Sequence, residues 1–211
     1  MLSSNLSLLW EKDGSWFKSI PWSAEDLYAL PPRPGSAPWS PHVIEQYIRD
    51  VPDFPKPGIL FKDITPLLQS PEGLKSSIDG LSSLVDPSSY DVICGIESRG
   101  FIFGTALAHA LGKGFIPIRK PGKLPSKTAA ESYELEYGTD TIEVHTDAVS
   151  PGERVLMVDD LLATGGTMEA GLKLIRKIGG DPVACVFVIE LLFLNGRTRL
   201  DAPSHSLLKV D

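Results

Sequence analysis

The chain has 211 residues, of which 42% are hydrophobic and 22% are charged, a balance typical of globular proteins. Acidic residues outnumber basic ones by 27 to 20, and the formal net charge of -7 argues against nonspecific nucleic-acid binding. No apolar run approaches the roughly 20 residues that a membrane-spanning helix needs. The N-terminal segment has neither the basic start nor the apolar core of a secretory signal, and the two cysteines, Cys94 and Cys185, lie in apolar runs typical of buried strands. We therefore expect a cytoplasmic protein with no nucleic-acid or membrane partner.

The first 40 residues differ in composition from the rest of the chain. They contain all four tryptophans (Trp10, Trp16, Trp22 and Trp39) and a proline-rich stretch at residues 31–38. Proline and glycine at this density oppose regular structure, whereas exposed indoles are unfavourable in a purely disordered tail. We predict an extension over residues 1–40 that packs on the main domain or on a partner subunit, with a mobile tail as the alternative, and a main domain over residues 41–211.

Beyond residue 41, hydrophobic periodicity and turn residues predict an alternation of helices and strands. In chain order we expect a short helix at 42–50 with Val43, Tyr47 and Ile48 on one side, a proline-stiffened extended segment at 51–58, a helix at 71–84, a strand at 91–96, a helix at 100–111, a strand at 114–118, an interruption at 119–149, a strand at 155–158, a helix at 168–178 and a strand from Val183. Strands that alternate with helices form parallel sheets with right-handed crossovers. The sequence therefore predicts an α/β fold with a parallel β-sheet flanked by helices.

The most informative segment joins the strand at 155–158 to the helix at 168–178. Asp159 and Asp160 follow the strand, and the small residues 163–167 lead into the helix. A small-residue loop at a helix N-terminus presents free backbone N–H groups to a phosphate, and two adjacent carboxylates suit sugar hydroxyls or a metal. The sequence thus indicates a site for a ribose 5-phosphate, against the alternative of an ordinary strand–turn–helix with solvated aspartates.

Two other segments are expected at the same edge of the sheet. Arg99 follows the strand at 91–96, and the cations Arg119, Lys120 and Lys123 follow the strand at 114–118, so all of them are candidates for binding a diphosphate. Alternatively, Arg99 pairs with Glu97, and the three cations form a solvated face. Residues 134–144 alternate polar and apolar around Gly138, which predicts a hairpin able to cover the site.

These motifs resemble those of the type I phosphoribosyltransferases, which bind 5-phosphoribosyl 1-diphosphate (PRPP). The resemblance is carried by residues 154–167, by 95–101, and by 119–125 with 132–138, and it extends from about residue 43 to the C-terminus. The last three segments and the start at 52–63 are similar to the adenine phosphoribosyltransferases in particular. The resemblance implies the fold of that family, with a small hood formed by residues 50–66 and a C-terminal segment, and a mobile hairpin within a catalytic loop at 119–149.

The resemblance also implies roles for individual residues. The residues that it implies for PRPP binding are Arg99, Arg119, Lys120, Lys123, Asp159, Asp160, Ala163, Thr164, Gly165, Gly166 and Thr167, and the diphosphate loop contains Glu97 and Ser98, joined by a cis peptide bond. Adenine would contact Leu60, Phe61 and Lys62. The implied catalytic residues are Glu136, Arg99 and Tyr137, and Asp63 also aligns with the family. Mg²⁺ is the implied cofactor. We expect PRPP to carry it, with Asp159 and Asp160 reaching it through water rather than as strong protein ligands.

The implied reaction transfers the phosphoribosyl group of PRPP to N9 of adenine, giving AMP and diphosphate for purine salvage, in a homodimeric enzyme. Two other functions compete with it. A PRPP-sensing regulator would keep the binding loop but needs a further binding module, which the acidic chain does not suggest. A guanine or xanthine phosphoribosyltransferase would need a cation to bind the 6-oxo group, and Lys62 is the candidate.

Overall fold

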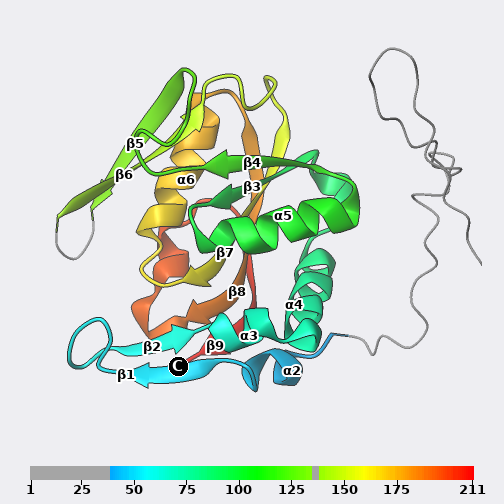
Figure 1. The fold of residues 1–211 in the computed structure, drawn as a ribbon. Helices are drawn as coiled ribbons and strands as arrows, with labels where there is room; N and C mark the ends of the chain where they lie inside the picture. Colours follow the sequence, from blue (N-terminus) through cyan, green and yellow to red (C-terminus); the bar gives the residue numbers. More distant parts are fainter. Residues whose placement is uncertain (1–38, 135–137) are drawn as a thin grey trace, which may run out of the picture. The chain divides into compact units, whose positions relative to one another are not determined.

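The computed structural model describes residues 39–134 and 138–211, which all belong to the larger of two compact units, Pro38–Asp211 (Figure 1). Its elements are α2 (Pro41–Glu45), β1 (Arg49–Pro52), β2 (Leu60–Asp63), α3 (Thr65–Gln69), α4 (Pro71–Leu84), η1 (Pro87–Ser89), β3 (Val92–Ile96), α5 (Arg99–Leu111), β4 (Gly114–Ile118), β5 (Thr128–Glu134), β6 (Thr139–His145), β7 (Arg154–Leu162), α6 (Gly166–Lys177), β8 (Asp181–Leu191), η2 (Leu192–Leu194), η3 (Gly196–Arg199) and β9 (Ser204–Val210). No helix in these residues is long and apolar enough to cross a membrane.

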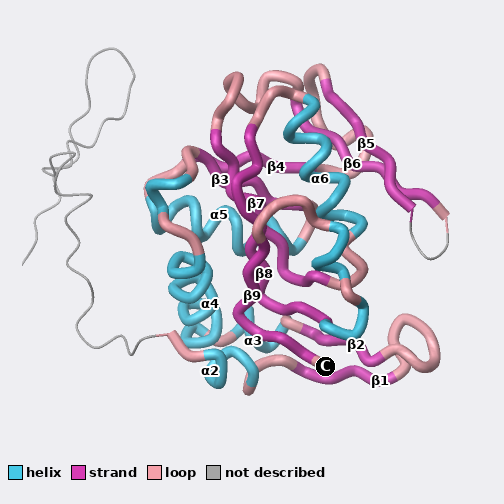
Figure 2. Tube along the Cα trace, turned by 180° about the vertical axis from the view of Figure 1, so that it is seen from behind, coloured by secondary structure: helices cyan, strands magenta, loops and turns pink. Residues whose placement is uncertain are grey.

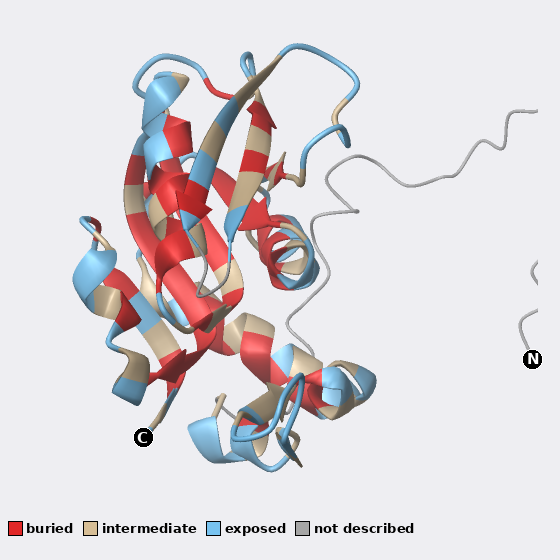
Figure 3. Cartoon of the chain, turned by 90° about the vertical axis from the view of Figure 1, so that its left-hand side faces the viewer, coloured by how far each residue is buried: buried red, intermediate tan, exposed pale blue. Residues whose placement is uncertain are grey.

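The centre of this unit is a five-stranded sheet with the order β4-β3-β7-β8-β9, in which every neighbouring pair is parallel. Parallel sheets are covered on both faces, and this sheet follows the rule (Figure 2). One cluster of buried residues joins the sheet to α6, β5 and β6, while the other joins it to α2, α3, α4 and α5. Figure 3 shows the buried residues concentrated in the central strands. The expected α/β fold is confirmed.

The strand order places a switch point between β3 and β7. From β3 the chain crosses through α5 to β4 on one side, and it later returns to β7 on the other side of β3. In open α/β sheets, ligands bind beyond the carboxyl ends of the strands at such a point. The residues that follow β3 and those that end β7 are therefore brought to one place, although more than 50 residues separate them in the sequence.

Most of the elements expected from the sequence lie where the periodicity places them. The helix at Pro71–Leu84 and the strand at Gly114–Ile118 have the expected bounds. Helix α6 buries Met168, Leu172, Leu174 and Ile175, as its pattern predicts. Cys94 and Cys185 are buried free thiols, and burial raises the pKa of Cys185 to about 12.

Three expectations were wrong. The helix predicted at 42–50 ends at Glu45 and buries Ile44, because residues 49–52 pair with 60–63 in an antiparallel ribbon, β1–β2. Strand β7 continues through both aspartates to Leu162, since β8 pairs with it along that length. The hairpin predicted at 134–144 begins earlier, at Thr128, and its second strand, β6, begins at Thr139, because Thr139 and Asp140 pair with Glu134 and Tyr133. The alternation in β5 is too polar to predict a strand.

Only the end of the tryptophan-rich extension lies within the described residues. Trp39 is partly buried against α4, where a Cβ added to Gly80 would lie 3.0 Å from the indole ring. The other three tryptophans, Trp10, Trp16 and Trp22, lie outside the described residues. The expectation that the extension packs on the main domain or on a partner subunit therefore stays a prediction.

The core should respond strongly to the loss of a central side chain. Phe187 of β8 is fully buried, and we expect Phe187→Ala to lower the free energy of unfolding by about 3–5 kcal/mol through the cavity that it leaves. Phe193 is 61% exposed, so Phe193→Ala should change it by no more than about 0.5 kcal/mol. Urea denaturation measures both, and equal losses would contradict the assignment of the core.

Candidate active site

A polar cavity of about 320 Å³ lies at the switch point, beyond the carboxyl ends of β3 and β7. Residues from four chain segments line it: Glu97, Ser98 and Arg99 after β3; Lys120 after β4; Tyr133 of β5; and Asp159, Asp160, Leu161, Leu162, Ala163, Thr164, Gly165, Gly166, Thr167 and Met168 along β7 and the start of α6. The structure therefore brings most of the expected PRPP residues together.

The loop between β7 and α6 is shaped to hold an anion through its backbone. Gly165 is the N-cap residue of α6 and has a left-handed conformation, with φ of 82°, which favours glycine. Helix α6 begins at Gly166, two residues before the predicted start, so Gly166 and Thr167 form its first turn. Their N–H groups have no partner within the helix and carry the positive end of its dipole. This geometry suits a phosphate monoester.

The two aspartates of β7 have different environments. Asp160 is 5% exposed and accepts a hydrogen bond from Nε of Arg99 in an ion pair. Asp159 accepts the N–H of Asp160 through Oδ1 at 2.9 Å. Burial, and then the neighbouring charge of Asp160, raise the pKa of Asp159 well above its ordinary value. The pair therefore holds a proton more readily than two separate carboxylates do.

The turn after β3 contains a cis peptide bond between Glu97 and Ser98, as the resemblance implies. The segment after β4 fixes the carboxylate of Glu97. Its Oε2 accepts hydrogen bonds from the backbone N–H of Lys120 at 2.8 Å and from Nε of Arg119 at 3.2 Å. These interactions, the backbone hydrogen bond first, lower the pKa of Glu97. Glu97 thus pairs with Arg119, and the alternative pairing with Arg99 is not the one observed.

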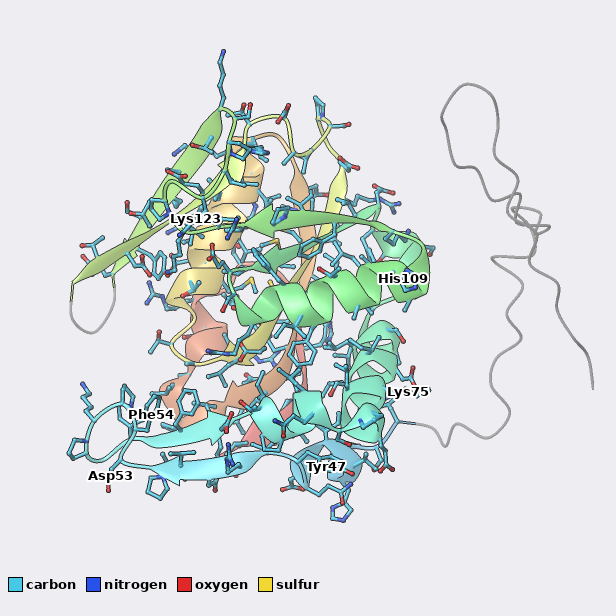
Figure 4. The ribbon with its side chains drawn as sticks, in the orientation of Figure 1. Tyr47, Asp53, Phe54, Lys75, His109 and Lys123 are labelled. Atoms are coloured by element: carbon cyan, nitrogen blue, oxygen red, sulfur yellow. The ribbon has the colours of Figure 1, made fainter. Side chains whose placement is uncertain are left out.

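The three candidate cations separate in space. Lys120 lines the cavity, and its ammonium donates to Oη of Tyr133 at 3.2 Å and to Asp140 of β6. Arg119 and Lys123 do not line the cavity. Arg119 is occupied by Glu97 and by the carbonyl of Lys123 at 3.3 Å, while Lys123 is exposed on the side that carries the hairpin (Figure 4).

A second cavity of about 470 Å³ has a more apolar lining. The β1–β2 ribbon and α3 form it, with Phe54 and Phe61 in edge-to-face contact, their ring centroids 5.1 Å apart. Figure 4 places Phe54 at the loop between β1 and β2. Thr65, through hydrogen bonds, and then Arg49 lower the pKa of Asp63 to about 2, so a carboxylate is present at this cavity at neutral pH. The cavity suits a flat, mainly apolar ring that carries hydrogen-bond donors.

The two cavities share one lining residue, Arg99. Its ion pair with Asp160 holds the guanidinium between the polar cavity and the aromatic one. Although burial alone disfavours its charge, Asp160 outweighs that effect and raises the pKa of Arg99. A ligand with a phosphorylated sugar in one cavity and a ring in the other would therefore have its linking atoms beside a permanent positive charge.

Comparison with known proteins agrees with this geometry. Residues 65–209 match the phosphoribosyl transferase domain, and the chain is 58% identical over 167 residues, 79% of its length and 95% of the relative's, to an adenine phosphoribosyltransferase of Parvibaculum lavamentivorans. The chain belongs to the adenine phosphoribosyltransferases.

Solved structures of the family have the same fold. The enzyme of Thermoanaerobacter pseudethanolicus is 50% identical, with a TM-score of 0.78 over 81% of this chain and 99% of the other. The enzyme of Saccharomyces cerevisiae, solved with an imino-altritol bisphosphate and adenine, is 40% identical, with a TM-score of 0.77 over 80% and 98%. Both matches leave about a fifth of this chain unmatched.

Several residues of this adenine phosphoribosyltransferase lie elsewhere than expected, or were not expected at all. Leu60 is 48% exposed and does not line the second cavity, and Glu136 and Tyr137 lie outside the described residues. Sequence reasoning missed the lining residues Val51, Phe54, Ile64, Thr65, Leu68, Tyr133, Leu161, Leu162 and Met168. The aromatic residues Phe54 and Phe61 on either side of the glycine-proline turn were the available signal for the second cavity.

Asp159 gives the site a pH-dependent cost in stability. Its pKa is higher in the folded chain than in the unfolded one, so the folded state keeps a proton that the unfolded state releases, and stability falls as pH rises above about 4 towards the folded pKa. We expect Asp159→Asn to remove this slope and to stabilise the ligand-free chain at neutral pH. Urea denaturation between pH 5 and pH 8 measures the effect.

Asp91→Asn is the control for this prediction. Arg154 lowers the pKa of Asp91 to about 2, so this group is ionised in both states across the measured range. Its replacement should leave the pH slope unchanged. A wild-type slope in Asp159→Asn would show that Asp159 does not hold the proton.

Proposed function

We propose that the chain transfers the 5-phosphoribosyl group of PRPP to N9 of adenine, with release of diphosphate and formation of AMP for purine salvage. The observation that carries the proposal is the meeting of a polar cavity and an aromatic cavity at Arg99. Binding both reactants across this junction would place them in contact, which removes much of the entropic cost of bringing them together.

The roles of the first cavity follow from its chemistry. The N–H groups at the start of α6 would bind the 5-phosphate, and the carboxylates of Asp159 and Asp160 would accept the ribose hydroxyls and stabilise positive charge that develops at the anomeric carbon. Lys120 and Arg99, together with the Glu97–Ser98 turn, would hold the diphosphate. Arg119 would act indirectly by fixing Glu97, and Lys123 is a further cation for the leaving group.

Mg²⁺ is the proposed cofactor, and the donor set fits the way this ion binds. Asp159 and Asp160 are the carboxylates of the β7 end, and no group of three or more metal-binding side chains occurs in the described residues. Mg²⁺ commonly keeps several waters and takes one or two carboxylates plus substrate phosphates. When bound with PRPP, it would supply charge neutralisation to the departing diphosphate.

The second cavity supports adenine rather than a 6-oxopurine. Opposite residues of an antiparallel ribbon share a face, and the opposite residues Val51 and Phe61 both line this cavity. Lys62 also lines the cavity, whereas the residue opposite it, Asp50, does not. Nζ of Lys62 donates to Oδ1 of Asp50 at 2.6 Å, so the ammonium is not free to bind a 6-oxo group. Adenine carries an amino group in place of the 6-oxo group and needs no cation there, and the backbone of Lys62 stays available to the base.

Product formation from single bases tests the proposal. Purified protein with PRPP and Mg²⁺ should form AMP from adenine and no nucleotide from guanine, hypoxanthine or xanthine, as resolved by chromatography. GMP, IMP or XMP would contradict the preference for adenine. PRPP binding with no nucleotide from any base would indicate a sensor in place of an enzyme.

Proton transfer at the base is proposed for Glu136, on the resemblance of the hairpin segment, with Tyr137 covering the site. Adenine loses its N9 proton as the new bond forms, and a carboxylate beside the imidazole ring can accept it directly or through water. We expect Glu136→Gln to lower kcat about 100-fold, in the range of general acid–base effects, with little change in the KM for PRPP.

Glu134→Gln is the matched control, because Glu134 is exposed and lies two residues earlier on the same hairpin. It should keep the wild-type kcat. Normal turnover by Glu136→Gln in a steady-state assay would remove Glu136 from the mechanism and leave water as the proton acceptor.

We also propose a homodimer, which rests on the resemblance.

A further inference from the structure

A backbone turn outside the expected motifs lies directly behind the proposed phosphate loop. Gly196, the first residue of η3, packs against residues 163–165 so closely that a Cβ at Gly196 would overlap the carbonyl oxygen of Ala163 and would lie 2.9 Å from N of Gly165. From the other side, a Cβ at Gly165 would overlap the carbonyl oxygen of Gly196. Two glycines therefore let the two backbones pack directly against each other.

The turn is anchored by an ion pair whose carboxylate is buried. Glu190, at the end of β8, is 3% exposed and accepts two hydrogen bonds from Arg197: from Nε at 2.9 Å and from Nη2 at 2.5 Å. Nη1 of Arg197 also donates to the carbonyl of Ser204 and, at 3.1 Å, to its Oγ. Oγ of Ser206 donates to Glu190 at 2.9 Å. One guanidinium thus ties the turn to both β8 and β9.

Glu190, the buried carboxylate of this ion pair, lies beside the strand that leads into the phosphate loop. Glu190 pairs across the sheet with Leu162, the last residue of β7, and the loop begins at the next residue, Ala163. At the far end of the turn, Arg199 donates to Glu169 in the first turn of α6 at 2.7 Å. The turn therefore contacts the loop itself and holds the helix that follows it.

We infer that Glu190 and Arg197 are positioning residues for PRPP, because their ion pair holds Gly196 against the phosphate loop. A loop that binds through backbone N–H groups has to be held within about 0.5 Å of the productive geometry, and small residues alone do not hold it there. Ordering a loose loop on binding would cost affinity. This inference rests on the proposed function, since it assigns the turn to the binding of PRPP.

A purely stabilising role explains the pair less well. Buried ion pairs are often no more stabilising than apolar side chains of the same size. Apolar side chains at these two positions could therefore match the stability of the pair, but they would lose its fixed geometry. Arg197 presents its donors in a rigid fork, and lysine cannot reproduce the simultaneous contacts to Glu190 and Ser204. Gly196 does not have a left-handed conformation, so its backbone would allow alanine. Only the contact with the loop excludes the alanine side chain.

The test compares two variants that disturb the contact from different directions. Arg197→Lys should raise the dissociation constant of Mg²⁺–PRPP, measured by calorimetry, about tenfold, and raise the KM for PRPP in parallel while the KM for adenine stays within about twofold. Gly196→Ala disturbs the contact from the side of the loop while keeping both members of the ion pair, and it should weaken PRPP binding at least as much. A role in stability alone would lower Tm without separating the two KM values.

Arg176→Lys is the matched control. Arg176 forms a pair with the exposed Asp201, with both contacts at 2.9 Å, and it connects α6 to the same C-terminal segment without reaching the loop. It should keep wild-type PRPP binding. If the wild type forms AMP but both test variants bind PRPP as the wild type does, the inference is overturned. Failure of the wild type to bind PRPP would overturn the proposed function itself.

Discussion

The ion pair between Arg99 and Asp160 is the contact on which the site depends. It joins the first residue of α5 to the carboxyl-terminal part of β7 across the point where the strand order reverses. Two adjacent carboxylates at the end of a buried strand repel each other, and the half-exposed guanidinium of Arg99 compensates one of them while the other takes up protons more readily. The same guanidinium borders both cavities. A single charge pair thereby stabilises the strand end and places a cation between the two proposed substrates.

Around this pair, the fold assigns different physical tasks to different segments. Rigid elements of the sheet supply the carboxylates and the start of α6, while the β1–β2 ribbon supplies aromatic surface and directs its polar side chains by the alternation of its two faces. The ribbon also pairs Lys62 with Asp50, which supports adenine over a 6-oxopurine. The C-terminal turn adds a third support, since Gly196 fixes the loop from behind. The site is therefore built by segments from nearly the whole length of the described chain.

This arrangement makes the stability of the ligand-free fold depend on the protonation of Asp159. A carboxylate with a raised pKa destabilises the ligand-free fold as pH increases, and a cation that arrives with PRPP would reverse that effect. Binding and stability are thus linked through Asp159, so the ligand would stabilise the chain by relieving a repulsion as well as by making contacts.

The sequence by itself determined the parallel α/β fold, the helices at 71–84 and around 168–178, and the small-residue loop that leads into the second of these helices, because apolar periodicity and small residues act locally. It also placed Glu97, Ser98 and Arg99 at the same sheet edge as that loop, since parallel strands end together. Only the tertiary structure decided which charges pair: Arg99 with Asp160, Arg119 with Glu97, and Lys62 with Asp50. The aromatic cavity and the role of Gly196 also depended on it. Such pairings join segments far apart in the chain, and spacing within one segment carries no information about them.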